Sequence, residues 1–461
     1  MNGKYGVRAA KRHGGANIIF NLMLTVIPVL LFYGVYVHVY LAATFWGRGN
    51  YVFMLMYAFL LVLLMVVYSG YRVRQFRTRE LIFSFVLASV LTNAVAYLVM
   101  CLIARRMLQL WGVVLVTAGQ WIVELGIYIM SRILLPMLEP DEPVIYIRDE
   151  SDDVIVEKLN SHRSRFSVGK IITSNHSWRE LMEAIRPYST VVLGDIPPET
   201  RQELIGYCFR TGRNVVVLPD MTDILINSAA PLILEDALAY DLNTQGMDPA
   251  FRMGKRCFDI LAAALGLVIL SPIMLITAAA VKLQDGGPVF YRQVRLTEGG
   301  KKFKLTKFRS MIVNAESATG AVLAGKEDAR ITKVGNFIRA MRIDELPQLW
   351  NILKGDMSLV GPRPERPEFY EIICDEYPEF DYRLKVKAGL TGYAQLYGKY
   401  NTTFADKARL DMYYIQHANF VLDLQLILYT IKIIFIREST EGVDDSRAPE
   451  AAEDETVGAA R

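Results

Sequence analysis

The sequence predicts a membrane protein: a four-helix transmembrane bundle, a small Rossmann-like parallel α/β domain, and a larger α+β domain. Four apolar runs each reach the ~20 residues that a helix needs to cross a bilayer, at 17–41, 51–70, 81–104 and 107–130. Short apolar strands then alternate with amphipathic stretches over 139–230, a pattern typical of parallel α/β sheets. A basic, glycine-containing half follows from 252 to 440, with one more apolar run at 257–281.

Composition agrees with membrane insertion and excludes several classes of function. Hydrophobic residues make up 52% of the 461 residues, and the mean hydropathy is +0.23. The net charge of +3 gives no global attraction to nucleic acid. The four cysteines show no CxxC spacing, so they predict neither a disulfide framework nor a zinc site. His417 is the sole histidine after residue 176, which argues against histidine-centred catalysis in the second half.

The first region, 1–138, is predicted to cross the membrane four times with both ends in the cytoplasm. The chain is basic before the first apolar run and again at 72–79, and basic loops stay on the cytoplasmic side. Glu124 is the one acid inside a span. It has two interpretations, a proton or ion path and a residue that faces a neighbouring helix. The second is favoured because no charged partner lies at matching depth.

The α/β domain is predicted at 139–230, with a connector at 231–251. Strands are expected at 144–147, 168–172, 190–193 and 215–218, and helices at 178–186 and 199–211. No GxGxxG motif follows the first strand, and residues 149–153 are acidic where a pyrophosphate would need backbone donors. We therefore interpret this domain as regulatory, without a dinucleotide site.

The apolar run at 257–281 is long enough to span the bilayer, but Ser271 and Pro272 lie at its middle. A proline removes a helix hydrogen bond, and a serine hydroxyl can bond the freed carbonyl. Both flanks are basic, which favours a re-entrant helix that returns to the same face. The alternative is a kinked fifth span. It would place the α/β domain and the larger α+β domain on opposite sides of the membrane.

A hairpin is expected next, with strands at 288–293 and 302–307 around a turn at 298–300. Lys304, Lys307 and Arg309 alternate with apolar residues. This basic strand face is either turned toward an anion or simply solvated. Residues 314–328 are small and polar, and are predicted to form a loop that could act as a lid.

The most informative stretch is 339–364, which reads RAMRIDELPQLWNILKGDMSLVGPRP. Its apolar residues recur at helical spacing, so Asp344 and Glu345 are expected early in an amphipathic helix that Gly355 ends. Acids here lie beside arginines, a combination that suits phosphate chemistry with a divalent metal. Asp356 is interpreted as a supporting or structural acid. The competing interpretation is a surface helix with ion pairs.

The last part contains a glycine-punctuated loop at 385–395 that could direct backbone N–H groups toward an anion. A helix at 405–417 is expected to turn its charged residues toward water, Asp411 among them. The apolar stretch 420–436 is predicted to lie in the membrane interface. The acidic tail at 441–461 is predicted to be disordered.

The half from about 252 to 440 resembles the bacterial sugar transferase family, the monotopic phosphoglycosyl transferases, and the whole chain resembles their large subclass. The motifs that carry the resemblance are KRxFD at 255–259, the central Ser271-Pro272, the basic strand 303–311, DELPQLWNILKGDMSLVGPRP at 344–364, GLTGYAQ at 389–395 and LDMYYI at 410–415.

The resemblance implies transfer of a sugar 1-phosphate from a UDP-sugar to undecaprenyl phosphate, with Mg²⁺ and release of UMP. Asp344 would be the nucleophile, forming a phosphosugar-aspartyl intermediate, and a Mg²⁺ ligand. Glu345 would be the neighbouring acid or base. The phosphate- and substrate-binding residues would be Arg339, Arg363, Lys307, Arg309 and Gln395.

By the same resemblance, the enzyme would work on the cytoplasmic face of a bacterial inner membrane, in contact with membrane lipid and without nucleic acid. It would begin exopolysaccharide, capsule or O-antigen synthesis, and a homodimer is left open. Two alternatives remain. One is a non-catalytic membrane scaffold or regulator, and the other is a glycosyltransferase that releases UDP.

Overall fold

The computed structural model describes residues 15–41, 48–76, 78–149, 155–156, 159, 166–242, 246–313, 328, 330–398 and 402–434. The chain divides into two compact units, 1–219 and 220–461, which are described separately. Three predictions fall mainly or wholly outside the described residues: the basic first tail, the loop at 314–328 and the acidic tail.

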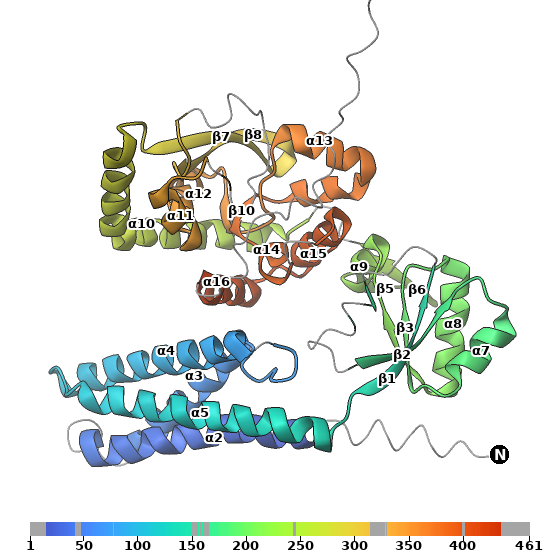
Figure 1. Cartoon of the computed structure of the whole chain (residues 1–461), viewed down its shortest axis with the longest axis horizontal. Helices are drawn as coiled ribbons and strands as arrows, with labels where there is room; N and C mark the ends of the chain where they lie inside the picture. Colours follow the sequence, from blue (N-terminus) through green and yellow to red (C-terminus); the bar gives the residue numbers. More distant parts are fainter. Residues whose placement is uncertain are drawn as a thin grey trace, which may run out of the picture. The chain divides into compact units, whose positions relative to one another are not determined.

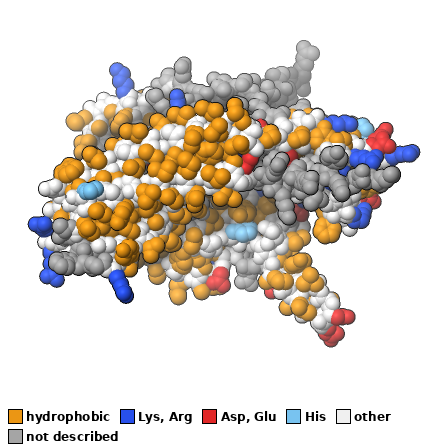
Figure 2. All heavy atoms as spheres, turned by 90° about the horizontal axis from the view of Figure 1, so that it is seen from below, with side chains coloured by type: hydrophobic (Ala, Val, Ile, Leu, Met, Phe, Trp, Pro, Cys, Tyr) orange, Lys and Arg blue, Asp and Glu red, His pale blue; other side chains and the backbone are white. Residues whose placement is uncertain are grey.

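The first unit begins with long apolar helices, α2 (Gly15–Val35) with its π-helical continuation η1 (Tyr36–Tyr40), α3 (Gly49–Val67), α4 (Thr78–Ala104) and α5 (Trp111–Leu138). Helix α2 packs against α3 and α5, and α4 packs against the same two helices. The face of these helices that Figure 2 shows is largely covered by hydrophobic side chains. With α10 of the second unit, five helices in the described part are long and apolar enough to cross a membrane.

Polar side chains are enclosed between these helices. The Tyr57 hydroxyl donates to Asn93 Oδ1 over 2.7 Å, and Asn93 Nδ2 donates to Gln120 Oε1 over 2.8 Å. Glu124 lies one turn after Gln120 and is fully buried. Its carboxyl oxygens have no hydrogen-bond partner among the described residues. Glu124 therefore faces the interior of the helix bundle, a position that both interpretations of this residue allow.

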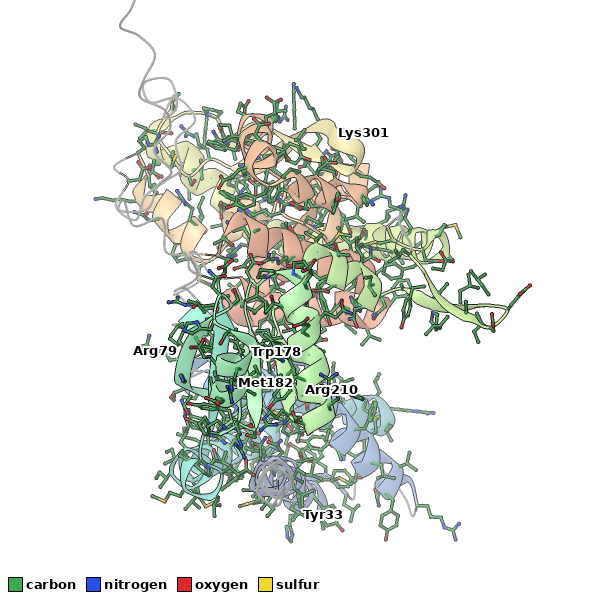
Figure 3. All side chains as sticks on the ribbon, turned by 90° about the vertical axis from the view of Figure 1, so that its right-hand side faces the viewer. Tyr33, Arg79, Trp178, Met182, Arg210 and Lys301 are labelled. Atoms are coloured by element: carbon green, nitrogen blue, oxygen red, sulfur yellow. The ribbon has the colours of Figure 1, made fainter. Side chains whose placement is uncertain are left out.

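The α/β domain has a four-stranded parallel sheet in the order β2-β1-β3-β4. Its elements are β1 (Glu142–Arg148), β2 (Phe166–Thr173), α7 (Trp178–Ile185), β3 (Thr190–Leu193), α8 (Pro198–Thr211) and β4 (Asn214–Val217). A capping box at Ser177 starts α7, and left-handed Gly212 ends α8. Figure 3 labels Trp178 and Met182 on α7. The predicted parallel α/β sheet is confirmed.

The second unit opens with α9 (Met221–Asn227) and a hairpin of β5 (Ala230–Leu234) and β6 (Ala237–Asp241). The two strands pair antiparallel, and nearly all of their side chains are exposed. A connector was expected over much of this stretch, and the sequence pattern alone did not indicate the hairpin.

The remaining elements build a compact α+β structure. A hairpin of β7 (Phe290–Thr297) and β8 (Lys301–Phe308), joined by η3 (Glu298–Gly300), confirms the expected one. Lys301 lies at its outer tip (Figure 3). The other elements are α10 (Pro249–Asp285), α11 (Lys333–Ala340), η4 (Ile343–Glu345), α12 (Gln348–Lys354), β9 (Ser358–Val360), α13 (Pro367–Glu376), η5 (Pro378–Lys385), β10 (Gly389–Thr391), α14 (Tyr393–Tyr397), α15 (Phe404–His417) and α16 (Phe420–Ile434).

Helix α10 bends without being interrupted. It is helical over 37 residues with Pro272 inside, and in Figure 1 it runs horizontally and then turns upward. Ser271 Oγ donates to the Val268 carbonyl over 2.8 Å. This is the carbonyl that an N–H at position 272 would have bonded. The expected role of the serine is confirmed, but the break is a bend in a continuous helix.

Both ends of α10 bond to other elements of the second unit. Near its start, Lys255 forms a buried ion pair with Asp423 of α16, and Arg256 donates to two carbonyls at the C-terminal end of α12 over 2.6 and 2.8 Å. At its other end, Asp285 is paired with Arg309, which follows β8. The bend lets one long helix meet the same structure at both ends.

Candidate active site

The acid pair lies in a 3₁₀ turn, not in an α-helix. Asp344 and Glu345 are in η4, and α12 begins only at Gln348. The physical reason is Pro347, which has no N–H to bond the carbonyl of Ile343, so the helical ladder cannot run through this point. Leu349 is buried as expected, but Trp350 is 54% exposed. Gly355 ends the helix in a left-handed conformation, as predicted.

Arg342 directs the chain into this turn. Its φ of 51° is unusual for a residue with a side chain, and in the described part of the second unit only Glu235 shares a positive φ without being glycine. This backbone conformation lies two residues before Asp344. Such local strain is often kept at functional sites. It brings Arg342 Nη1 to 3.7 Å from Glu345 Oε2.

Glu345 is buried and surrounded by cations. Lys307 Nζ lies 3.1 Å and Arg363 Nη2 lies 3.3 Å from its Oε1 atom, in addition to the contact with Arg342. Burial alone would raise the pKa of Glu345, but these positive charges hold the pKa well below its usual range. An acid with so low a pKa is a weak base near neutral pH. The structure thus favours Glu345 as the anion that gathers the cations.

Asp344 is different, because its carboxylate is left unengaged. Among the described residues it makes no hydrogen bond and no ion pair. Burial and the neighbouring Glu345 raise the pKa of Asp344 to about 6, against the opposing charges of Lys307, Arg339 and Arg363. The site therefore holds one partly exposed carboxylate that is free to react or to bind a ligand.

Asn351 fixes α12 against β8 and so sets the position of Lys307. Its Nδ2 donates to the Lys304 carbonyl over 2.8 Å, and its Oδ1 accepts the Thr306 N–H over 3.1 Å. The basic strand was expected either to face an anion or to be solvated, and each interpretation holds for a different residue. Lys304 is exposed to solvent, whereas Lys307 turns to the acid pair.

The turn that carries Arg363 is held by close backbone packing. A Cβ atom on Gly361 would collide with the Lys387 carbonyl, and one on Gly389 would collide with the Gly361 nitrogen. Glycine is therefore required for close approach between the turn after β9 and the loop around β10. The Gly389 N–H donates to the Pro362 carbonyl, so this N–H is not available to an anion.

The other predicted site residues differ in how they relate to the acid pair. Arg339, in the last turn of α11, acts on Asp344 through its charge alone. Arg309 is buried against Gly287 and held by Asp285, and is not joined to the acid pair by any bond in the described part. Gln395 Nε2 is buried in α14 without a partner in the described part. Asp356 accepts a hydrogen bond from Asn351 over 3.2 Å, which fits a structural role.

Sequence reasoning did not assign Arg342 or Asn351 to the site. Arg342 is one of the arginines beside the acids in the 339–364 stretch, and its place two residues before Asp344 was the available signal. Nothing in the sequence around Asn351 indicated its role. That role depends on a hydrogen bond with Thr306 of β8, which lies 45 residues away along the chain.

A model of the bacterial sugar transferase family matches residues 250–437. The chain is 44% identical over 190 residues to an Aeromonas hydrophila protein named UDP-N-acetylgalactosamine-undecaprenyl-phosphate N-acetylgalactosaminephosphotransferase, covering 40% of this chain and 44% of that protein. It is 38% identical over 201 residues to the undecaprenyl-phosphate galactose phosphotransferase of Salmonella typhimurium, covering 41% of each.

The match to the Bacillus subtilis sugar transferase EpsL is 41% identical over 187 residues and covers 41% of this chain and 90% of that protein. The matched region thus spans less than half of the Aeromonas and Salmonella relatives and nearly all of EpsL. The residues that the family model matches, 250–437, contain the acid pair, its cations and nearly all of α10. The chain belongs to the bacterial sugar transferase family.

Proposed function

We propose that this protein transfers a sugar 1-phosphate from a UDP-sugar to undecaprenyl phosphate and releases UMP. The observation that carries the proposal is the unengaged Asp344 carboxylate beside a Glu345 that holds Lys307, Arg342 and Arg363 in place. The relatives' names, which specify undecaprenyl-phosphate sugar phosphotransferases, support the transferred group and the acceptor.

In the first step, an Asp344 oxygen attacks the phosphorus that carries the sugar. A P–O bond to that oxygen forms, the bond to the bridging oxygen of the diphosphate breaks, and UMP leaves with the electron pair. In the second step, a phosphate oxygen of the lipid attacks the same phosphorus and displaces Asp344. A carboxylate nucleophile divides the transfer into two easier displacements.

The cations orient phosphate and stabilise its charge. The Arg363 side chain is 45% exposed, so its guanidinium has a surface left for a ligand while it contacts Glu345. Guanidinium groups bind phosphate through paired hydrogen bonds. Lys307 and Arg339 add positive charge on the side of Asp344. Glu345 acts by keeping these groups in register before the substrate arrives.

Mg²⁺ fits the donor set. Mg²⁺ is commonly bound by one or two carboxylates together with substrate phosphates and water, and Asp344 offers such a carboxylate. The described residues hold no group of three or more acidic, His or Cys side chains that could form a complete cage. The ion would neutralise phosphate oxygens when it is bound together with the donor.

We further propose that α10 is re-entrant and holds the site at the cytoplasmic face of a bacterial inner membrane. Its two arms are attached to one compact unit through Lys255, Arg256 and Asp285. A soluble domain lies on one side of a membrane, so both ends of α10 would return to that side. There the soluble donor and the lipid phosphate can meet, to begin assembly of a surface polysaccharide.

The test is nucleotide release by the full-length protein in membranes, with a polyprenyl phosphate and a panel of UDP-sugars. We expect UMP from one donor in the presence of Mg²⁺ and a return to background after chelation with EDTA. Release of UDP would instead indicate an ordinary glycosyltransferase. No nucleotide release from any donor, with folded protein, would favour the scaffold alternative.

Replacing Lys307 with methionine should lower kcat/KM for the donor by about 100-fold, as loss of one charge-stabilising donor typically does. The change leaves the buried Glu345 with one cation fewer and removes positive charge beside Asp344. Lys304→Met is the matched control, because Lys304 lies on the same strand and faces solvent. Equal losses in the two variants would contradict the assignment of Lys307 to the site.

A further inference from the structure

The turn at 361–364 carries Arg363, and its last three carbonyls, those of Pro362, Arg363 and Pro364, each accept a hydrogen bond from outside the turn. Its two prolines have no N–H, so acceptor atoms provide most of its anchoring. The donors come from three different elements, β10, η5 and β7. The hydrogen bonds are Gly389 N to Pro362 O (2.8 Å), Arg383 Nη2 to Arg363 O (3.0 Å) and Arg295 Nη1 to Pro364 O (3.1 Å).

Glu365 follows the turn and links the two arginines. Its Oε2 lies 3.7 Å from Arg295 Nη1, and its Oε1 lies 3.6 Å from Arg383 Nη1. Its own carbonyl accepts the Leu296 N–H over 3.1 Å. The two guanidinium groups therefore lie on either side of one carboxylate, and each also bonds a carbonyl next to it.

Each arginine is itself fixed by a second partner. Gln293 Oε1 accepts from Arg295 Nε and Nη2 over 3.0 and 2.6 Å. Asp411 Oδ2 accepts from Arg383 Nη2 over 2.7 Å. Asp411 was expected to face water, and that expectation is wrong, because the residue is buried and paired with Arg383. The two arginines have little freedom to move away from the turn.

Simple stabilisation explains this arrangement poorly. The contacts of Glu365 with both arginines exceed hydrogen-bond length, so they add little directional bonding energy. Burying arginine is costly, and buried ion pairs are weak evidence for stability. Each arginine instead donates a hydrogen bond to a carbonyl of the turn, Arg383 to that of Arg363 over 3.0 Å and Arg295 to that of Pro364 over 3.1 Å. These two bonds fix the backbone of a residue that contacts Glu345.

We infer that Arg295, Glu365 and Arg383 form a clamp that positions Arg363 toward the acid pair and its phosphate ligand. These three are positioning residues, since they act through Arg363. The geometric part of the inference stands on the contacts alone, and its catalytic consequence rests on the proposed function.

The first test measures the clamp without any activity. Glu365→Gln keeps the shape of the side chain and removes the charge that faces both arginines. Hydrogen exchange followed by mass spectrometry should show faster exchange in the peptide containing Gly361, Arg363 and Glu365, while α12 is unchanged. Glu368→Gln, an exposed acid in α13, is the matched control and should match the wild type. Unchanged exchange around Arg363 in Glu365→Gln would overturn the clamp.

The second test is a double-mutant cycle on UMP release. Glu365→Gln should lower kcat by about 10-fold, less than the ~100-fold that a misplacement of 1 Å can cause. If it acts through Arg363, Arg363→Ala combined with Glu365→Gln should be no slower than Arg363→Ala alone. Multiplication of the two losses would assign Glu365 an independent role and overturn the clamp.

Arg383→Lys is the second variant, which keeps the charge beside Asp411 but cannot reach the Arg363 carbonyl and Glu365 together. It should follow Glu365→Gln in both measurements. A wild-type protein that releases no UMP would contradict the proposed function only. The exchange of the turn would then still decide whether the clamp exists.

Discussion

Asp344→Asn should reduce UMP release by at least about 1,000-fold, because an amide cannot serve as the nucleophile of a covalent intermediate. The change is nearly isosteric and breaks no hydrogen bond in the described part. The folded state raises the pKa of Asp344, so ionised Asp344 opposes folding above its ordinary pKa. The unfolding temperature of Asp344→Asn at neutral pH should therefore be at least that of the wild type.

The matching control is Asp375→Asn, an exposed acid in α13, which should leave both activity and unfolding temperature unchanged. Mass spectrometry of protein incubated with donor alone should find a sugar-phosphate adduct on the peptide containing Asp344. Retained UMP release in Asp344→Asn would contradict the nucleophile assignment. An adduct on another residue would transfer the role there.

Ser271→Ala combined with Pro272→Ala should straighten α10 and abolish transfer. The double change restores the N–H that Pro272 lacks and removes the hydroxyl that replaces it at the Val268 carbonyl. A straight helix of this length extends about 55 Å, well beyond the ~30 Å hydrocarbon core. It could not bring both Lys255 and Asp285 to one compact unit.

Topology can be read by labelling single cysteines at Met253 and Leu283, both exposed near the ends of α10, after the native cysteines are replaced by alanine. A membrane-impermeant maleimide should reach both positions from the same side in the parent and from opposite sides in the double variant. Pro136→Ala, which removes a proline from α5, is the control and should preserve labelling and activity. Same-side labelling with full activity in the double variant would refute the role assigned to the Ser-Pro step.

Short-range patterns predicted the elements of the α/β domain well. The bounds of β3 agree residue for residue, and α7 and α8 differ by one residue at an end. Apolar runs of strand length between capped helices leave few alternatives. The same reasoning failed at η4. There the helical spacing of four apolar residues led to the prediction of a helix that includes the acid pair, and the effect of one proline was not considered. Pro347 decides the local structure there because it removes a backbone donor.

The acid pair and its neighbouring arginines could be located from one contiguous motif, but the residues that contact the pair in three dimensions could not. Glu345 bonds Lys307 and Arg363, which are 38 and 18 residues away in sequence. Arg309 looked equivalent to Lys307, yet it pairs with Asp285 at the end of α10. Spacing along a strand shows which face a side chain lies on, and the three-dimensional packing decides which acid that face meets.

The cations around Glu345 also bear on how tightly the site can bind its ligands. Lys307, Arg342 and Arg363 already share one internal carboxylate. Part of their positive charge is therefore offset before any phosphate arrives. In the proposed reaction, this offset lowers the affinity of the site for any small free anion, including inorganic phosphate and the departing nucleotide. A donor that also contacts the rest of the site can overcome it, so the built-in anion favours both selective loading and rapid product exit.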